Sequence, residues 1–231
     1  MKIKLFDTDI GKDEELGIQK VLKSGFWASG SGINNVKKFE TSFQKFIHSK
    51  NCIAVNNGTS ALNLALSLIN LKNKEVIVPS LTFVSSVHAI VLNGGKPVFA
   101  DVDPKTLCVD PKSINSLISK KTAAILPVHF AGMPCKISEI SDICKKNDLL
   151  MIEDAAHAAG STYKNKKIGS HGFAVCFSFH PVKNLAMPTG GLIALNDKNH
   201  LSQRKLLDSR RWCGISDRVG TSYDVKEMGW N

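Results

Sequence analysis

Short apolar runs alternate with helical patterns between residues 52 and 153 of this chain. Runs of four or five apolar residues predict strands, and the stretches between them, with apolar residues at helical spacing, predict helices. Strands and helices that alternate in this way form a largely parallel sheet covered on both faces. The pattern therefore predicts an α/β fold. We expect strands at 52–55, 75–78, 96–100, 123–126 and 149–153, and helices at 58–70, 84–92, 111–118 and 136–146.

The alternation is absent from both ends of the chain. No helical pattern separates the last two predicted strands, at 174–178 and 192–195. We therefore expect these two strands to be antiparallel neighbours in a mixed, mostly parallel sheet. Linker-like composition is absent, and we expect one unit over residues 1–231 with an N-terminal helical segment. We expect helices at 13–24 and 35–48 before the alternation, then strands at 174–178 and 192–195 and a helix at 198–210 after it.

The composition is that of an ordinary globular protein, with 43% hydrophobic and 22% charged residues. The net charge of +10 is spread along the chain without a dense basic block, so we expect no nucleic-acid partner. A basic surface still favours anionic small molecules. No apolar run approaches the roughly 20 residues that span a bilayer, and we expect no membrane partner. The six cysteines are scattered and follow no secretory leader, which predicts reduced thiols in the cytoplasm.

A phosphate-binding turn is the first candidate site. Ligands of such sheets bind beyond the carboxyl ends of the strands. Gly58-Thr59-Ser60 follows the first predicted strand and begins a helix. The first turn of a helix offers free N–H groups and the positive end of the helix dipole, which together bind phosphate. An ordinary helix cap is the competing interpretation.

A lysine and an aspartate follow two other predicted strands. Lys183 lies in a loop beyond an apolar strand, where an amine in a dry pocket can form a Schiff base with an aldehyde cofactor. Asp154 ends the strand 149–153, where a carboxylate can keep a pyridine nitrogen protonated. A loop-capping role for Asp154 stays open. Together with the phosphate turn, these residues are the parts of a pyridoxal 5'-phosphate site.

Four further residues lie at or just beyond strand ends. His157 can hydrogen-bond a cofactor oxygen, and Ser178 can supply a second phosphate ligand. His180 can move a proton, and the ring of Phe83 can stack on a cofactor. For His180 and Phe83, packing is an equal alternative, and for His157 and Ser178 a purely structural role is the more common one. We expect no metal ion at this site.

The sequence resembles the DegT/StrS-type family of sugar aminotransferases, among the fold-type I pyridoxal phosphate enzymes. The similarity extends along nearly the whole chain. It is carried by Gly25-Phe26-Trp27 with Gly30, Asn57-Gly58-Thr59-Ser60-Ala61-Leu62, Pro79 with Thr82-Phe83, Val98-Phe99-Ala100-Asp101-Val102-Asp103, His129-Phe130-Ala131-Gly132, Glu153-Asp154-Ala155-Ala156-His157-Ala158, Ser178-Phe179-His180 with Lys183-Asn184, and Gly190-Gly191.

The resemblance implies a fold like the large domain of aspartate aminotransferase and a role for each matching residue. Lys183 would bind the cofactor aldehyde and move protons, and Asp154 would pair with the pyridine nitrogen. The remaining roles concern the cofactor and the substrate. The resemblance places Gly58, Thr59, Ser60, Phe83, His157, Ser178 and Asn231 at the cofactor, Asn231 reaching across a homodimer, and Trp27 and His180 at the substrate.

The family's usual substrates are nucleotide-linked keto-sugars, with glutamate as the common amino donor, and polysaccharide biosynthesis is a typical setting. A related chemistry, sugar deoxygenation, typically has histidine at the lysine position, so Lys183 argues against it. Family members are usually much longer than 231 residues. We therefore expect that the small C-terminal domain is absent. An inert fragment that binds cofactor or a partner is the alternative to an active enzyme.

Overall fold

The structure, a computed structural model, describes residues 7–27, 34–219 and 222–230. Its central sheet has seven strands in the order β1-β9-β8-β5-β4-β2-β3. β9 is antiparallel to both its neighbours, β1 and β8, and the other pairs are parallel. The predicted mixed, mostly parallel sheet is confirmed. The strands are β1 (Asn51–Val55), β2 (Glu75–Pro79), β3 (Lys96–Ala100), β4 (Thr122–Ile125), β5 (Leu150–Asp154), β8 (Ala174–Ser178) and β9 (Gly191–Leu195).

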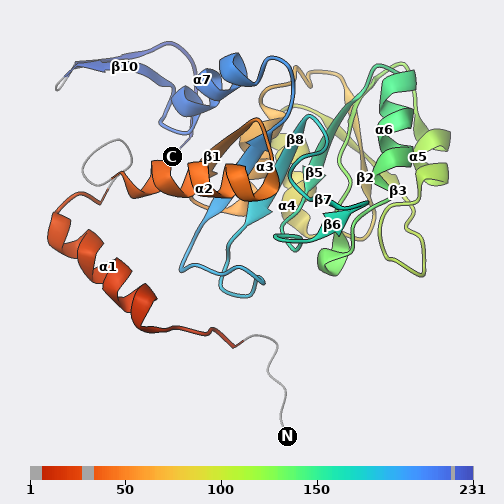
Figure 1. Ribbon diagram of the computed structural model, residues 1–231. Coiled ribbons are helices and arrows are strands. Elements are labelled where there is room, and N and C mark those ends of the chain that lie inside the picture. Colours follow the sequence, from red (N-terminus) through yellow and green to blue (C-terminus); the bar gives the residue numbers. More distant parts are fainter. Residues whose placement is uncertain (1–6, 28–33, 220–221, 231) are drawn as a thin grey trace, which may run out of the picture.

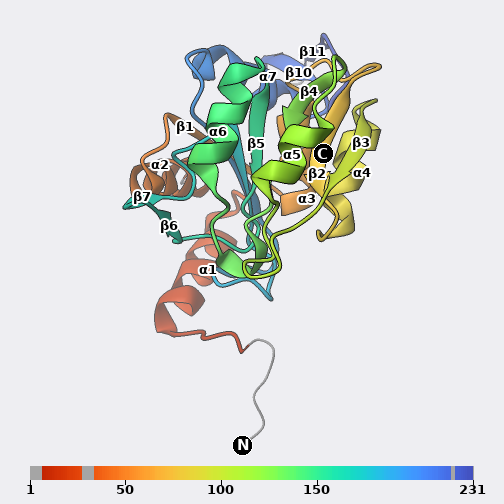
Figure 2. The ribbon, with the colours of Figure 1, turned by 90° about the vertical axis from the view of Figure 1, so that its right-hand side faces the viewer.

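Helices cover both faces of this sheet (Figure 1 and Figure 2). The apolar cluster on one face contains buried residues of α2, α5 and α6, and the cluster on the other face contains those of α3, α4 and α7. The helices are α2 (Asn35–Ile47), α3 (Gly58–Leu66), α4 (Val84–Leu92), α5 (Pro111–Leu117), α6 (Ile137–Lys146) and α7 (His200–Arg210). The predicted helix at 58–70 ends earlier, at Leu66, because the chain turns at residues 67 and 68 and bends at residue 69.

The middle of the sheet is the most deeply buried part of the fold. Every residue of β8 and β9 is buried, as expected for strands with helices on both faces.

Five strands of the sheet, β3, β2, β4, β5 and β8, are parallel, so their carboxyl ends lie at the same edge of the sheet. This edge gathers the polar residues that follow separate strands.

Three small elements were not predicted from the sequence. The short helix η1 (Phe130–Gly132) follows β4, and two hairpins pair β6 (Thr162–Tyr163) with β7 (Lys166–Lys167) and β10 (Ile215–Val219) with β11 (Ser222–Val225). Segments this short carry too little periodicity to predict a strand or a helix.

The N-terminal helix α1 (Lys12–Ser24) extends away from the sheet and has no buried residue (Figure 1). Gly25 ends it in the left-handed conformation, at φ 69°, which confirms the predicted stop. None of the helices in the described ranges is both long and apolar enough to cross a membrane.

A buried carboxylate joins α2 to β1 and α7. Glu40 is 2% exposed, and its Oε2 accepts from Arg204 Nη2 at 2.7 Å while its Oε1 accepts from Arg211 Nη1 at 2.8 Å. The Ala54 N–H also donates to Oε1, at 3.0 Å. Burial alone would raise the pKa of Glu40, but these donors and charges bring it below its ordinary value. The carboxylate therefore stabilises the fold at neutral pH.

We expect Glu40→Ala to lower the free energy of unfolding by about 3 kcal/mol, because it removes the buried carboxylate that Arg204 and Arg211 share and leaves them only the more exposed Asp208. The effect should be present near pH 7. It should shrink as pH falls below the ordinary carboxyl value, because protonation then removes the same charge from the wild type. Urea denaturation at several pH values measures it. Asp142→Ala is the control: its pair with Lys145 at 3.9 Å is exposed and should contribute less than about 1 kcal/mol.

Candidate active site

A cavity of about 490 Å³ opens at the carboxyl edge of the sheet. It collects most of the predicted site residues from five separate segments of the chain. Val128, after β4, and Phe130, the first residue of η1, add an apolar wall. The described lining residues are Asn57, Gly58, Thr59, Leu62, Thr82, Phe83, Ser85, Val128, Phe130, Asp154, Ala156, His157, Cys176, Ser178, His180, Val182 and Lys183.

Asp154 is held rigidly at the inner wall of this cavity. It ends β5 and is 4% exposed. Its Oδ2 accepts from Ser86 Oγ at 2.8 Å and its Oδ1 accepts from the Ala156 N–H at 3.1 Å. Ser86 lies on α4, is fully buried, and also bonds Thr82 Oγ1 at 2.9 Å. The Asp154 carboxylate therefore has a fixed orientation in a partly apolar cavity. A carboxylate held in this way is suited to pair with a positively charged ring nitrogen.

Lys183 approaches the same cavity from the loop between β8 and β9. The Lys183 side chain is partly buried. The backbone N–H of Lys183 donates to the His180 carbonyl at 2.8 Å, in a tight turn. Burial lowers the pKa of the Lys183 amine, and the negative charge of Asp154 opposes that shift. A lowered pKa increases the fraction of neutral amine, which is the nucleophilic form.

His157 lines the same cavity from the turn after β5. Burial lowers the pKa of its imidazole, and the positive charge of Lys183 lowers it further against the opposing charge of Asp154. Nδ1 of His157 accepts the Ala131 N–H at 3.3 Å. That acceptor role leaves Nε2 as the protonated nitrogen of a neutral ring. The ring can therefore donate one hydrogen bond.

The first turn of α3 forms the end of the cavity nearest β8. Asn57 caps this helix, because its Oδ1 accepts the Ser60 N–H at 2.8 Å. A Cβ on Gly58 would lie 2.6 Å from Ser178 Cβ, so only glycine lets the helix start this close to β8. The N–H groups of Gly58 and Thr59 belong to the turn where helices carry unpaired donors. With the Ser178 hydroxyl beside them, they fit a phosphate group.

Phe83 and His180 stand at the mouth of the cavity. Phe83 is the N-cap residue of α4 and is 71% exposed, so core packing does not account for it. Nδ1 of His180 accepts the Val182 N–H at 3.4 Å, within the loop that carries Lys183. Both side chains are free to meet a bound molecule at the opening.

Two predicted residues lie elsewhere, and a third is outside the described residues. Trp27 follows α1, is 72% exposed, and donates from Nε1 to the Leu22 carbonyl at 3.4 Å. It does not line the cavity. Ser60 lines a second cavity instead. The prediction for Asn231, like the motif position Gly30, falls outside the described ranges.

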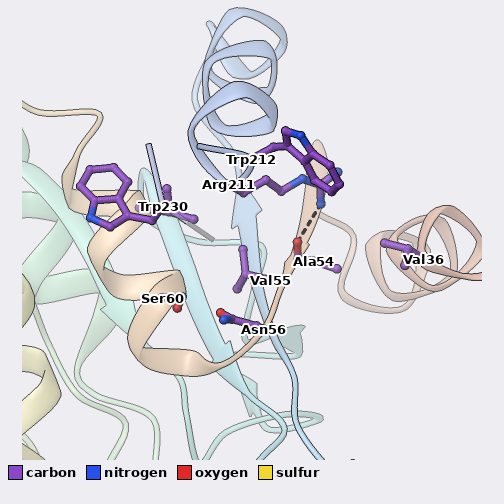
Figure 3. Close-up of a pocket in the computed structure, with 9 residues that line it drawn as sticks. Val36, Ala54, Val55, Asn56, Ser60, Arg211, Trp212 and Trp230 are labelled. Carbon is purple, nitrogen blue, oxygen red and sulfur yellow. Dashed lines mark hydrogen bonds between the residues drawn. The ribbon is translucent and has the colours of Figure 1, made fainter. Parts of the chain in front are cut away.

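The second cavity lies between α2, the end of β1, α3 and the residues after α7, and measures about 220 Å³ (Figure 3). Arg211 already donates to the Ala54 carbonyl at 2.7 Å and to Glu40. Among the described residues that line it there is no lysine, histidine or carboxylate. It therefore lacks the acid–base groups that the first cavity contains. Its lining is Val36, Ala54, Val55, Asn56, Ser60, Leu64, Arg211, Trp212 and Trp230.

The sequence analysis missed Ser86 and gave Asn57 no role of its own. Ser86 is 68 residues from Asp154 in the chain, and no local pattern joins them. Asn57 could have been found, because an asparagine before a helix start is a strong capping signal.

We expect Gly58→Ala to destabilise the fold by about 1–3 kcal/mol, because the added methyl group would overlap Ser178 Cβ. It should also weaken binding of inorganic phosphate or a phosphorylated cofactor, since α3 must shift away from β8. Thermal denaturation and equilibrium dialysis measure the two effects. Gly17→Ala in α1 is the control: nothing lies within 4 Å of its added Cβ, and stability should be unchanged or slightly higher. Equal losses in both variants would contradict the argument.

A protein family and a curated relative match nearly the whole chain. A model of the DegT/DnrJ/EryC1/StrS aminotransferase family matches residues 8–231. The spore coat polysaccharide biosynthesis protein SpsC of Bacillus subtilis (strain 168) is 36% identical over 227 residues, which are 96% of this chain and 58% of SpsC.

Solved structures of similar proteins share the fold. An aminotransferase from Psychrobacter cryohalolentis is 33% identical with a TM-score of 0.89. PseC of Helicobacter pylori, an aminotransferase involved in the biosynthesis of pseudoaminic acid, is 28% identical with a TM-score of 0.86. Each match covers 96% of this chain and 58% of the other. The chain thus spans little more than half the length of these relatives.

Proposed function

Because this chain belongs to the DegT/DnrJ/EryC1/StrS aminotransferase family, we propose that it forms the cofactor-binding part of a pyridoxal-phosphate-dependent sugar aminotransferase. Aminotransferases of this family depend on pyridoxal phosphate. One observation carries the proposal: Lys183, Asp154 and the first turn of α3 line one cavity. These are an amine, a carboxylate and a phosphate cradle, the three kinds of group that this cofactor requires.

When bound, the cofactor supplies an aldehyde that reacts with amines and a ring that accepts an electron pair. In our proposal, Gly58, Thr59 and Ser178 hold its phosphate. Asp154 holds the proton on the ring nitrogen, and Ser86 keeps the carboxylate oriented toward that proton. Because Asp154 is 4% exposed, little water competes for this contact.

The remaining residues act around the reacting carbon. Nζ of Lys183 would hold the cofactor through its aldehyde, and the same amine would serve as the base that holds a proton beside the reacting carbon. The lowered pKa of the Lys183 amine favours both roles, since a neutral amine is at once a nucleophile and a base. Phe83 and His157 line the same cavity, where Phe83 would stack on the ring and His157 would donate to a cofactor oxygen.

We further propose that the amino acceptor is a nucleotide-linked keto-sugar and that glutamate is the donor. Three observations support this substrate class. The relative SpsC belongs to polysaccharide biosynthesis, PseC to pseudoaminic acid biosynthesis, and the net charge of +10 favours an anionic diphosphate. His180, at the mouth of the cavity, is our proposed sugar contact, in a cytoplasmic homodimer to which the partner subunit adds Asn231.

The test is amino transfer from glutamate to a panel of nucleotide-linked keto-sugars, with 2-oxoglutarate as the measured product. The proposal expects 2-oxoglutarate to form with at least one sugar. The alternative is a unit that binds cofactor or a partner without turnover. Tight cofactor binding with no 2-oxoglutarate from any sugar would support that alternative. Light scattering tests the proposed homodimer. A monomer that binds the cofactor with full affinity would contradict it.

A further inference from the structure

A buried pair of ionisable side chains lies behind the candidate active site. Glu153 and His129 are both fully buried, and Nε2 of His129 lies 2.9 Å from Oε2 of Glu153. Successive residues of a strand point to opposite faces of its sheet, and of the two neighbours on β5 it is Asp154 that lines the cavity. The proposed chemistry uses Asp154 and gives Glu153 and His129 no role.

This buried pair is only partly satisfied. Oε1 of Glu153 has no hydrogen-bond partner among the residues that the structure describes. Room for this oxygen exists because residue 172 is glycine, where an added Cβ would lie 2.5 Å from Oε1. A partly paired polar group in the interior costs stability, and an apolar pair of similar volume is often at least as stable. Stability alone therefore does not explain why Glu153 and His129 meet here.

Hydrogen bonds fix both the ring and the backbone of His129. Nδ1 accepts from the Cys135 N–H at 3.1 Å, so Nε2 carries the ring proton and donates it to Glu153. The backbone N–H of His129 donates to the Asp154 carbonyl at 3.0 Å. His129 thus joins the segment after β4 to two successive residues of β5.

The short helix η1 begins at the residue after His129 and contains a strained position. Ala131 has φ 50° and ψ 26°, a left-handed conformation that alanine rarely adopts. Such a conformation persists only where the surrounding structure holds it in place. The bonds of His129 hold η1 at its start. Ser161 holds its end, because its Oγ donates to the Gly132 carbonyl at 2.9 Å.

The same short helix contacts His157 in the candidate active site. The Ala131 N–H donates to Nδ1 of His157 at 3.3 Å, which leaves the ring proton on Nε2. The ring of Phe130 meets the ring of His157 edge-on, with the two centroids 6.3 Å apart. A Cβ on Gly132 would lie 3.0 Å from the His157 carbonyl oxygen, so the two segments are closely packed. The position of His157 therefore depends on the position of η1.

We propose that Glu153 and His129 are positioning residues for His157. Their hydrogen bond holds η1 in place, so that the Ala131 N–H keeps His157 in the form that donates from Nε2. Neither Glu153 nor His129 is among the described residues that line the cavity, so both act through η1. The use of this donor by a cofactor oxygen rests on the proposed function. The tautomer of His157 is a property of the chain without cofactor.

The test compares two replacements of Glu153 that have nearly the same size. Glu153→Gln keeps an oxygen that accepts from His129, whereas Glu153→Met removes the acceptor. NMR of the ring nitrogens, in the cofactor-free chain with isotope-labelled histidine at neutral pH, shows which nitrogen of His157 carries the proton. His157→Gln assigns its signal among the seven histidines. Hydrogen exchange measures the protection of the Ala131 amide.

In Glu153→Met the ring of His157 should become a mixture of tautomers. The Ala131 amide should exchange about tenfold faster, the effect expected when one ordinary hydrogen bond is lost. Glu153→Gln should resemble the wild type in both measurements. If Glu153→Met does not fold, Glu153→Asp decides, because it draws the carboxylate back by one methylene group and should produce a smaller change in the same direction.

Glu75→Met is the matched control. Glu75 begins β2, its side chain is 15% exposed, and it pairs with Lys96 at 3.6 Å. The same replacement there should lower the stability of the fold and leave the His157 signal and the relative protection of the Ala131 amide unchanged. Equal changes in the two methionine variants would overturn the proposal, since they would reflect a general loss of stability. A folded Glu153→Met or Glu153→Asp chain with wild-type signals would overturn it too.

A second readout concerns the cofactor and rests on the proposed function. Glu153→Met should bind pyridoxal phosphate severalfold more weakly than Glu153→Gln, because a displaced His157 no longer donates to the cofactor. Equal affinities, with the His157 signal changed, would contradict the link between this pair and the cofactor. Failure of the wild-type chain to bind the cofactor would count against the proposed function alone, since the NMR and exchange measurements need no cofactor.

Discussion

Replacing Lys183 with alanine should abolish the visible absorption band that forms when pyridoxal phosphate binds, because that band requires a covalent bond between the aldehyde and an amine. Amino transfer should fall by at least about 10²–10⁴-fold, the usual contribution of a positioned acid or base, and further through the lost covalent step. The fold should be unaffected, since the side chain is only partly buried in a loop. Absorbance titration and single-turnover transfer measure the two losses.

The matched control for Lys183 is Lys205→Ala on the exposed face of α7. It removes the same charge from the chain and should leave the band and the transfer rate unchanged. Persistence of the band in Lys183→Ala at wild-type intensity would contradict the assignment. Loss of the band in both variants would point to a general electrostatic effect of net charge.

Asp154→Asn should weaken cofactor binding by about 1.5–3 kcal/mol, roughly tenfold to hundredfold in affinity, because a charge-assisted hydrogen bond becomes a neutral one. The amide has almost the shape of the carboxylate, and Ser86 can still donate to its oxygen, so the fold should remain. The transfer rate should fall further than the affinity, since a ring without its proton accepts electrons poorly. Fluorescence titration gives the affinity, and saturating cofactor isolates the rate.

Asp101→Asn provides the control for Asp154. Asp101 follows β3, so it too is a carboxylate at a strand end, but it is exposed and does not line the cavity. Its replacement should change neither affinity nor rate. An Asp154→Asn variant that binds and turns over like the wild type would show that the carboxylate serves only to cap the loop after β5.

Much of the fold could be predicted from the sequence, because the spacing of apolar residues reflects which side chains are buried. Buried parallel strands are continuous apolar runs, and the rule that ligands bind beyond their carboxyl ends singled out Asp154, Lys183 and Gly58 before any contact was known. The structure places all three in one cavity. The antiparallel pairing of β8 with β9 followed in the same way, from the absence of a helix between them.

Contacts between distant segments were not accessible from the sequence. The bond of Ser86 to Asp154 and the ion pairs of Glu40 with Arg204 and Arg211 each depend on which elements pack together. Ser60 shows a second limit. It was grouped with Gly58 and Thr59 by adjacency, but successive side chains of a helix point in different directions, and Ser60 lines the other cavity.

The central claim is that Nζ of Lys183 is the amine that takes the cofactor aldehyde. The direct measurement is borohydride reduction of the wild-type chain after incubation with pyridoxal phosphate, followed by mass mapping of every lysine-containing peptide. We predict a single stoichiometric pyridoxyl adduct on Lys183, lost in Gly58→Ala in proportion to the weakened phosphate site. A stoichiometric adduct on another lysine, with Lys183 unmodified, would contradict the account.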